Sequence, residues 1–443
     1  MRLFHFFAGI TLEKIDFWQT EVIFDKKPGE IKMNDSYNAL IEKSLTLILD
    51  RFESSRNPYG FIDTKFNIVT GADFTGEEPH FRKDFIFGWI QGRALESLAK
   101  HEEYFAAGKR YDLCRRIHLA MEKLCRKLED CRRRHHRISF AMTPDGAPLG
   151  NPVEKSRTFA DLFYGKGLLC AAAALHDKVL LGTAQEILQQ VFNDIEAETF
   201  VSGQQSFDPK NPASDPSPEK VSEGPRMIAL GALADLIKIM PEKALYAAKA
   251  AEYINFILDN HTLESGGKLC FFEDIHREKR TPFAVNGYLL CDPGHGLEFT
   301  GLAGRVLRMM KAEKLLDGEL FHRSAEMLPQ IFIRLFDLGF QKSAGGIVKS
   351  ADAVTGEILN SDMPWWSLPE TIRAAREVAA LFPAAAGEVL PRAAAAANSF
   401  ELYIQANGFA CQTRDAAGRI VNVIPACPDA DPGYHTNLCL MEG

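Results

Sequence analysis

Six distinctive positions recur along the chain at nearly constant intervals of about 65–75 residues. Each interval contains two stretches in which apolar residues recur with the period of an α-helix, so one repeat unit is a pair of helices. The distinctive position falls near the start of the second helix of each pair. In chain order the positions are Arg93, Phe159–Phe163, Arg226, His295, Glu370 and His435.

This repeat restricts the fold. Six helical pairs whose second helices direct their N-termini to one place form a closed ring of inner and outer helices, which is an all-α (α/α)6 barrel. We predict about twelve helices with short β-hairpin inserts and no βαβ units. An open helical solenoid is the alternative, but its repeat units are usually shorter. The expected organisation is a single barrel domain over residues 1–443, with residues 1–35 as an N-terminal extension.

The apolar periodicity also predicts where the elements lie. Residues 60–71 are expected to form a short hairpin, and residues 266–274 and 345–359 are expected to form strand-like inserts. The polar, proline-rich segment 201–220 is expected to be a long loop or lid. The expected helices cover residues 36–52, 84–105, 109–133, 156–175, 181–196, 222–239, 242–258, 317–338, 366–382 and 386–404, with a further helix beginning at 292.

The segment from Cys291 to Glu298 has the sequence of a helix start. Asp292 is expected to be the N-cap and Pro293 the first helical residue, where its missing N–H costs nothing. His295 and Glu298 then lie three residues apart on one face. The helix dipole disfavours a charged imidazole and the carboxylate favours one, so the pair can serve as an acid–base device. Alternatively, His295 is a polar residue with its hydrogen bonds satisfied and Glu298 is an ordinary helix-start carboxylate.

Composition excludes several functions. The formal net charge of −8 argues against broad binding of nucleic acid, which needs a basic surface. The basic run 132–137 follows an amphipathic stretch and is interpreted as the solvated end of a helix. The sequence contains no glycine-rich phosphate loop, no G-x-S-x-G and no H-E-x-x-H motif. His276 and His322 have no neighbours at ligand spacing, so no metal site is expected.

The cysteines and the first residues bear on the compartment. Nine cysteines without a C-x-x-C pair are interpreted as reduced thiols. Residues 1–10 are apolar but are not followed by the cleavage site of a signal peptide, and no window of the sequence approaches a membrane span. We therefore expect a cytoplasmic protein that does not enter a membrane.

Several short motifs occur in a characteristic order. They are Pro293-Gly-His-Gly-Leu-Glu298, Trp365-Trp-Ser-Leu-Pro-Glu370 and Gly433-Tyr-His435, preceded by Asn57-Pro-Tyr-Gly-Phe61 and Trp89-Ile-Gln-Gly-Arg93. From about Pro58 onward the chain resembles the N-acylglucosamine 2-epimerase superfamily, which includes cellobiose 2-epimerases and aldose–ketose isomerases. The resemblance implies a cofactor-independent enzyme that acts on a mono- or disaccharide. Because members of the family often dimerise, a homodimer is a further expectation.

The resemblance also implies a mechanism. The family abstracts a proton next to the carbonyl of the opened sugar and passes through a cis-enediolate, which needs two proton carriers. His295 and His435 are the implied carriers, one acting as base and the other as acid. Glu298 would orient and tune His295, and Glu370 would bind sugar hydroxyls or support a histidine.

Further residues are implied in substrate binding. Arg93 would stabilise the enediolate oxygen, unless it forms a structural ion pair. Trp89 and Trp366 would stack on the sugar, each four residues before a polar site residue, and Trp365 could do the same; core packing is the alternative for all three. Arg226 would supply positive charge for an acidic or phosphorylated sugar, or else face solvent at a helix start.

Two departures from the family leave other functions open. Many relatives have a histidine where this chain has Ile228, and a glutamate where it has Gly231. The segment that carries His435 is also shorter than in the family, so this histidine could fray. The alternatives to a 2-epimerase are an aldose–ketose isomerase, a catalytically silent sugar-binding relative, and a glycoside hydrolase or lyase that uses carboxylates among Glu298, Glu370, Asp161 and Asp362.

Overall fold

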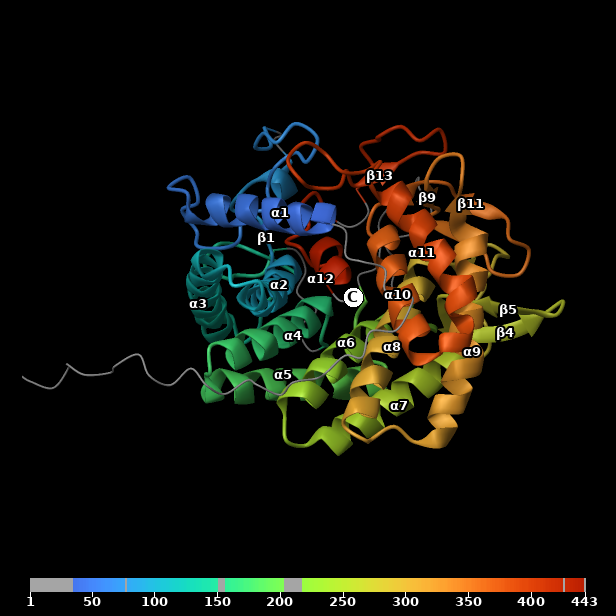
Figure 1. The fold of residues 1–443 in the computed structure, drawn as a ribbon. Helices are drawn as coiled ribbons and strands as arrows, with labels where there is room; N and C mark the ends of the chain where they lie inside the picture. Colours follow the sequence, from blue (N-terminus) through green and yellow to red (C-terminus); the bar gives the residue numbers. More distant parts are fainter. Residues whose placement is uncertain (1–34, 76–77, 150–155, 203–216, 425–426, 442–443) are drawn as a thin grey trace, which may run out of the picture.

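A computed structural model describes residues 35–75, 78–149, 156–202, 217–424 and 427–441 (Figure 1). The predicted N-terminal extension 1–35 therefore lies almost wholly outside the described residues, as does most of the segment 201–220. No helix in the described ranges is both long enough and apolar enough to cross a membrane.

Twelve α-helices in the described residues form two concentric rings (Figure 1). Consecutive inner helices pack on one another, and α12 contacts both α10 and α2, which closes the inner ring. The predicted (α/α)6 barrel is therefore confirmed. The outer helices are α1 (Asp35–Glu53), α3 (Tyr111–His135), α5 (Lys178–Glu196), α7 (Lys243–Asn260), α9 (Gly318–Gly339) and α11 (Ala386–Phe400). The inner helices are α2 (Gly88–Ala107), α4 (Phe159–Ala174), α6 (Gly224–Ile239), α8 (Pro293–Ala312), α10 (Ser367–Leu381) and α12 (Thr436–Met441).

Burial explains which helices are inside. Helices α4 and α6 are buried on nearly every face, because apolar and small residues surround them and neighbours cover them on all sides. The outer helices α3 and α9 bury one stripe only and present charged residues on the other face. The alternation of these two patterns along the chain produces the alternation of inner and outer helices.

Short antiparallel strand pairs precede most inner helices. These pairs are β1 (Ile86–Phe87) with β2 (Ala141–Met142), β3 (Lys220–Ser222) with β6 (Asp274–His276), β7 (Leu290–Cys291) with β10 (Ser350–Asp352), and β12 (Met363–Pro364) with β13 (Thr413–Arg414). Helices α2, α6, α8 and α10 each begin within three residues after one of these strands. The remaining strands are β4 (Thr262–Ser265), β5 (Lys268–Phe271), β8 (Phe340–Gln341), β9 (Gly346–Ile347) and β11 (Ile358–Asn360). The strands therefore fix where the N-termini of four inner helices lie.

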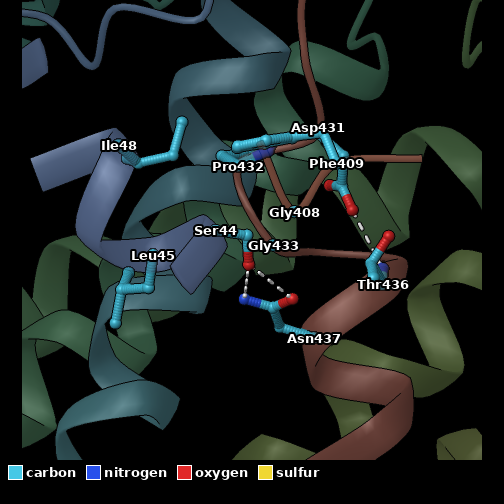
Figure 2. Close-up of a pocket in the computed structure, with 10 residues that line it drawn as sticks. All are labelled: Ser44, Leu45, Ile48, Gly408, Phe409, Asp431, Pro432, Gly433, Thr436 and Asn437. Atoms are coloured by element: carbon cyan, nitrogen blue, oxygen red, sulfur yellow. Dashed lines mark hydrogen bonds between the residues drawn. The ribbon is translucent and has the colours of Figure 1, made fainter. Parts of the chain in front are cut away.

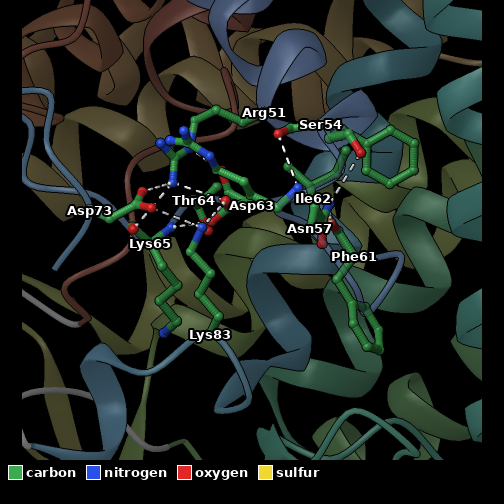
Figure 3. Close-up of polar contacts among 12 residues, drawn as sticks. Arg51, Ser54, Asn57, Phe61, Ile62, Asp63, Thr64, Lys65, Asp73 and Lys83 are labelled. Carbon is green, nitrogen blue, oxygen red and sulfur yellow. Dashed lines mark hydrogen bonds and ion pairs between the residues drawn. The ribbon is translucent and has the colours of Figure 1, made fainter. Parts of the chain in front are cut away.

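The strands also account for small errors in the predicted boundaries. Helix α2 begins at Gly88 and not at residue 84, because β1 occupies residues 86–87. The predicted hairpin at 60–71 is reduced to a turn closed by a single antiparallel bridge between Phe66 and Asp73, without the two expected strands. Arg51 of α1 instead organises it: the guanidinium donates to Asp63 at 2.9 Å and to Asp73 at 2.6 Å (Figure 3).

Glycines set the closest approach between inner helices. A Cβ atom on Gly167 of α4 would lie 2.1 Å from the carbonyl oxygen of Gly92 on α2, and a Cβ on Gly92 would lie 2.6 Å from the backbone of Phe163. Neither glycine could carry a side chain without moving one helix away from the other. This crossing brings Arg93 next to Phe163 at the open end of the ring.

We predict that Gly167→Ala destabilises the barrel by about 1–3 kcal/mol, because the added methyl group has no space between α2 and α4. Gly182→Ala in α5 is the matched control, since nothing lies within 4 Å of its added Cβ. The control should be neutral or stabilising by about 0.5–1 kcal/mol. Urea unfolding measures both changes; equal effects at the two positions would contradict the close helix crossing.

Candidate active site

The start of α8 has the predicted cap. Asp292 accepts a hydrogen bond from the backbone N–H of Gly294 at 2.9 Å and a longer one from that of His295 at 3.4 Å, and Pro293 occupies the first helical position. The second carboxylate oxygen of Asp292 pairs with Nζ of Lys349 at 2.5 Å. The cap thereby fixes the backbone of His295 at the mouth of the ring.

The side chain of His295 is held by residues that the sequence did not reveal. Its Nδ1 lies 2.9 Å from Oε2 of Glu273 and 3.9 Å from Oε1 of Glu223. The predicted orienting role of Glu298 is therefore taken by Glu273. Both partners are fully buried at the ends of the paired strands β3 and β6, and this non-local pairing had no signal in the sequence.

Glu298 belongs instead to the surroundings of His435. Nδ1 of His435 lies 2.7 Å from Oε1 of Glu370, so Glu370 supports a histidine, which was one of its two predicted roles. One carboxylate oxygen each of Glu298 and Glu370 and one ring nitrogen of His435 all lie within 4.8 Å of one another. Glu298 sits one turn below His295 on α8 and reaches toward α10, whose Arg373 pairs with Glu370.

One indole ring contacts both histidines. The ring of Trp366 stacks on His295 with a centroid distance of 5.4 Å, and its centroid lies 5.6 Å from that of His435. The two imidazoles, about 140 residues apart in the chain, are thus brought to one place. Trp365 lies at the edge of the group, 6.4 Å from His435, and its Nε1 donates to Thr436 at 3.3 Å.

Arg93 lies in an aromatic cage. Its guanidinium carbon is 4.5 Å from the ring centre of Trp89, 4.2 Å from that of Phe163 and 4.7 Å from that of Tyr434. No hydrogen bond or ion pair joins Arg93 to the described part of the chain, so the alternative of a structural ion pair is not supported. Trp89 is buried and stacks on Phe140, which makes it a wall of the cage.

Two other candidates lie elsewhere. Arg226 is buried between the inner and the outer helices. Its guanidinium lies 3.6 Å from the centre of the phenyl ring of Phe256 and donates to the carbonyl of Ile195 at 3.2 Å. It faces the outer helices α5 and α7, so the structure does not bring it to the histidines. Asp161 forms a capping box with Thr158 at the start of α4, which explains it as a structural carboxylate.

The C-terminal segment that carries His435 is tightly anchored. Asn437 contacts Nε2 of the buried His101 at 2.9 Å and exchanges hydrogen bonds with Ser44 of α1 (Figure 2). Asp431 caps the turn by accepting from the backbone N–H groups of residues 434–436. A small pocket remains between α1 and this segment (Figure 2). The expected fraying of His435 therefore does not apply to the described residues.

The side chain of Lys166 fills the space beside Gly231, one of the two positions that differ from many relatives. A Cβ on Gly231 would lie 2.7 Å from Nζ of Lys166, which is buried and donates to the hydroxyl of Tyr434 at 3.0 Å. Lys166 also pairs with Glu96 at 3.1 Å. The absence of a side chain at Gly231 therefore accommodates a buried cation beneath the aromatic cage.

The two histidines have opposite protonation. Burial lowers the pKa of His295, but the carboxylates of Asp292 and Glu273 outweigh it and raise the pKa to about 10. Burial also lowers the pKa of His435, and there the positive charge of Arg93 adds to the effect, so that its pKa falls to about 3. At neutral pH the site therefore contains one imidazolium and one neutral imidazole.

Two clusters near the histidines contain side chains of the kinds that bind metal ions. One is Glu223, Glu273 and His295, and the other is Glu298, Glu370 and His435. We assign neither group to a metal, because each imidazole Nδ1 is within hydrogen-bonding distance of a carboxylate oxygen. Distances of 2.9 Å and 2.7 Å are those of hydrogen bonds between the imidazole and the carboxylate.

Solved structures with a similar fold are sugar enzymes. The chain matches cellobiose 2-epimerase from Bacillus thermoamylovorans with a TM-score of 0.67 and 13% identity, over 92% of this chain and 97% of that one. It matches a D-mannose isomerase with a TM-score of 0.67 and 14% identity, over 94% and 98%. A GH76 α-1,6-mannanase from Salegentibacter matches with a TM-score of 0.53 and 12% identity, over 92% and 98%.

No protein-family model and no curated protein sequence matches the chain. The similarity to solved structures therefore establishes the fold, an (α/α)6 barrel that it shares with sugar epimerases and a sugar isomerase. This is the fold that the resemblance to the N-acylglucosamine 2-epimerase superfamily implied.

We expect the imidazole signals of His295 and His435 to stay in opposite protonation states between about pH 5 and pH 8, because their pKa values lie on either side of this range. NMR titration of ¹⁵N-histidine-labelled protein measures this, with the His295→Gln and His435→Gln variants assigning the signals. Titration of either ring near its usual pKa would contradict the electrostatics described here.

Asn437→Ala should loosen the segment of His435, because it removes the hydrogen bonds that tie this segment to the buried His101 and Ser44. The expected loss of stability is about 1–3 kcal/mol. Hydrogen exchange should rise in residues 431–441 specifically. Gln189→Ala, which removes an exposed amide on α5, should change neither quantity.

Proposed function

We propose that the protein is a cofactor-independent sugar 2-epimerase that passes through a cis-enediolate. The observation that carries this proposal is the pair of histidines of opposite protonation that both contact Trp366, each hydrogen-bonded to a glutamate. Moving a proton from one face of a carbon atom to the other needs one base and one acid at the same time. The substrate is an aldose, either a monosaccharide or the reducing end of a disaccharide.

His435 starts as the base. Its Nδ1 is engaged by Glu370, so Nε2 removes the proton from C2 of the opened sugar, and the electron pair of the C–H bond forms the enediolate. Arg93 stabilises the negative oxygen with donors that no described residue occupies. His295 then gives the proton of Nε2 to the opposite face of C2, which yields the epimer. The two roles exchange in the reverse direction.

An aldose–ketose isomerase is the second candidate, because the same enediolate gives a ketose when the proton is returned to C1. The similarity in fold between this chain and a D-mannose isomerase supports this second candidate. The two reactions differ only in which carbon faces the protonated histidine. Product analysis separates them, since one gives an aldose and the other a ketose.

A glycoside hydrolase is less well supported by the carboxylates. One carboxylate oxygen each of Glu298 and Glu370 lie within 4.8 Å of each other and of a ring nitrogen of His435. Glycosidases keep their two carboxyl groups about 5–9.5 Å apart, with the sugar between them. Glu370 is also committed to His435 and Arg373.

Incubation of the protein with N-acetylglucosamine, glucose, mannose or cellobiose in heavy water should place deuterium at C2 of at least one of these sugars. His295→Gln and His435→Gln should each lower the exchange rate by about 100- to 10,000-fold, because each removes a proton carrier. His322→Gln, an exposed histidine on α9, is the control and should leave the rate unchanged.

Mass spectrometry and proton NMR of the recovered sugar measure the exchange. The proposal fails if none of the sugars gains deuterium. It also fails if the protein releases reducing ends from a mannan oligosaccharide and Glu298→Gln or Glu370→Gln abolishes that release while the histidine variants do not.

A further inference from the structure

Glu223 has no part in the mechanism above, yet it is enclosed together with His295. It lies between β3 and α6, and its side chain is fully buried. One carboxylate oxygen each of Glu223 and Glu273 and one ring nitrogen of His295 lie within 4.8 Å of one another. Neither carboxylate oxygen of Glu223 has a hydrogen-bond partner in the described ranges. A buried carboxylate in such a position needs a compensating positive charge or a proton.

Negative groups outnumber positive ones here. Only one carboxylate, Glu273, is hydrogen-bonded to the imidazole, and the cations of the neighbouring segments are directed to other acids. The charged and titratable groups that face Glu223 and His295 are Glu273 and Asp274 around β6, Lys220 on β3, Asp292 and Glu298 around α8, and Lys349 before β10.

The two lysines do not compensate Glu223. Lys349 pairs with Asp292 at 2.5 Å, and Lys220 pairs with Asp274 at 2.9 Å. A single imidazolium would then have to balance both Glu223 and Glu273. Two carboxylates this close together in a buried site do not both stay ionised, because their mutual repulsion and the loss of hydration favour protonation of one.

We propose that Glu223 is a neutral carboxylic acid at neutral pH and a positioning residue for His295, holding one proton beside the ionised Glu273. Burial, reinforced by the charge of Glu273, raises the pKa of Glu223 well above its usual value, in agreement with the geometry. Glu273 is the member that accepts the hydrogen bond from Nδ1, so Glu223 is the member that keeps the proton.

The consequence for catalysis rests on the proposed function. One ionised carboxylate at Nδ1 keeps His295 protonated and correctly oriented. A second would bind the proton so tightly that His295 could not release it to the enediolate. Glu223 would therefore close the Nδ1 side of the imidazole to water without adding a charge.

Glu223→Gln tests the protonation state without needing a substrate, because an amide imitates the neutral acid in shape and charge. As the pH rises from about 5 to 8, the carboxyl group of Glu223 ionises in the unfolded chain but not in the folded protein, so wild-type stability falls relative to the variant. The melting temperature of Glu223→Gln minus that of wild type should therefore grow by about 2 °C or more over this range. Glu219→Gln, the same change at an exposed position nearby, should show a constant difference.

The titration of His295 gives a second, independent readout. Glu273→Gln should lower its pKa by about 1 unit or more, whereas Glu223→Gln should leave it within about half a unit. The proposal is overturned if Glu223→Gln lowers the pKa of His295 as much as Glu273→Gln does, if its melting-temperature difference shrinks with rising pH, or if it fails to fold at neutral pH. Each of these results would mean that Glu223 is an ionised partner of His295. Loss of deuterium exchange with every sugar would refute the proposed function and leave this result standing.

Discussion

The site depends on one interaction that occurs twice, a buried imidazole hydrogen-bonded through Nδ1 to a buried glutamate. The pairs His295–Glu273 and His435–Glu370 have similar distances but different surroundings. Burial and the nearby positive charge of Arg93 lower the pKa of His435, so that imidazole remains neutral, and Arg373 pairs with its partner Glu370. Around His295 the carboxylates prevail and the imidazole is charged. The same local bond thus occurs with a charged imidazole in one place and a neutral imidazole in the other, because burial and the neighbouring charges decide the protonation.

The barrel makes this difference stable by fixing each helix start. Short strands end directly before α2, α6, α8 and α10, so the first turns of these helices cannot slide along their axes. Glycines at the α2–α4 crossing remove the side chains that would otherwise keep the helices apart. The backbone positions from which the side chains of the site extend are thereby fixed, which favours a preorganised site.

The sequence predicted the parts of this arrangement that are local. Helical periodicity and the cap at Asp292 depend on neighbouring residues, so the helices and the position of His295 followed from them. The partners of His295 did not, because Glu223 and Glu273 meet only when β3 pairs with β6, far along the chain. Arg226 was misplaced for a related reason: a residue at the start of an inner helix can face either the ring interior or the outer helices. Periodicity alone does not distinguish these two faces at a helix that is buried all round.

The departures from the family resemblance have a common physical basis in the distribution of buried charge. Helix α6 has Ile228 and Gly231 where many relatives carry a histidine and a glutamate, so it brings no ionisable group to the ring at these positions. Lys166 of α4 occupies the space above Gly231 and reaches Tyr434, whose ring lies under Arg93. The acidic group that α6 brings to His295 is Glu223, at its N-terminal end, whereas Asp235 further along the helix pairs with Arg305. Helix α6 therefore places a carboxyl group beside His295 at its N-terminal end, whereas most other residues of the candidate site lie on α2, α8, α10 and the segment before α12.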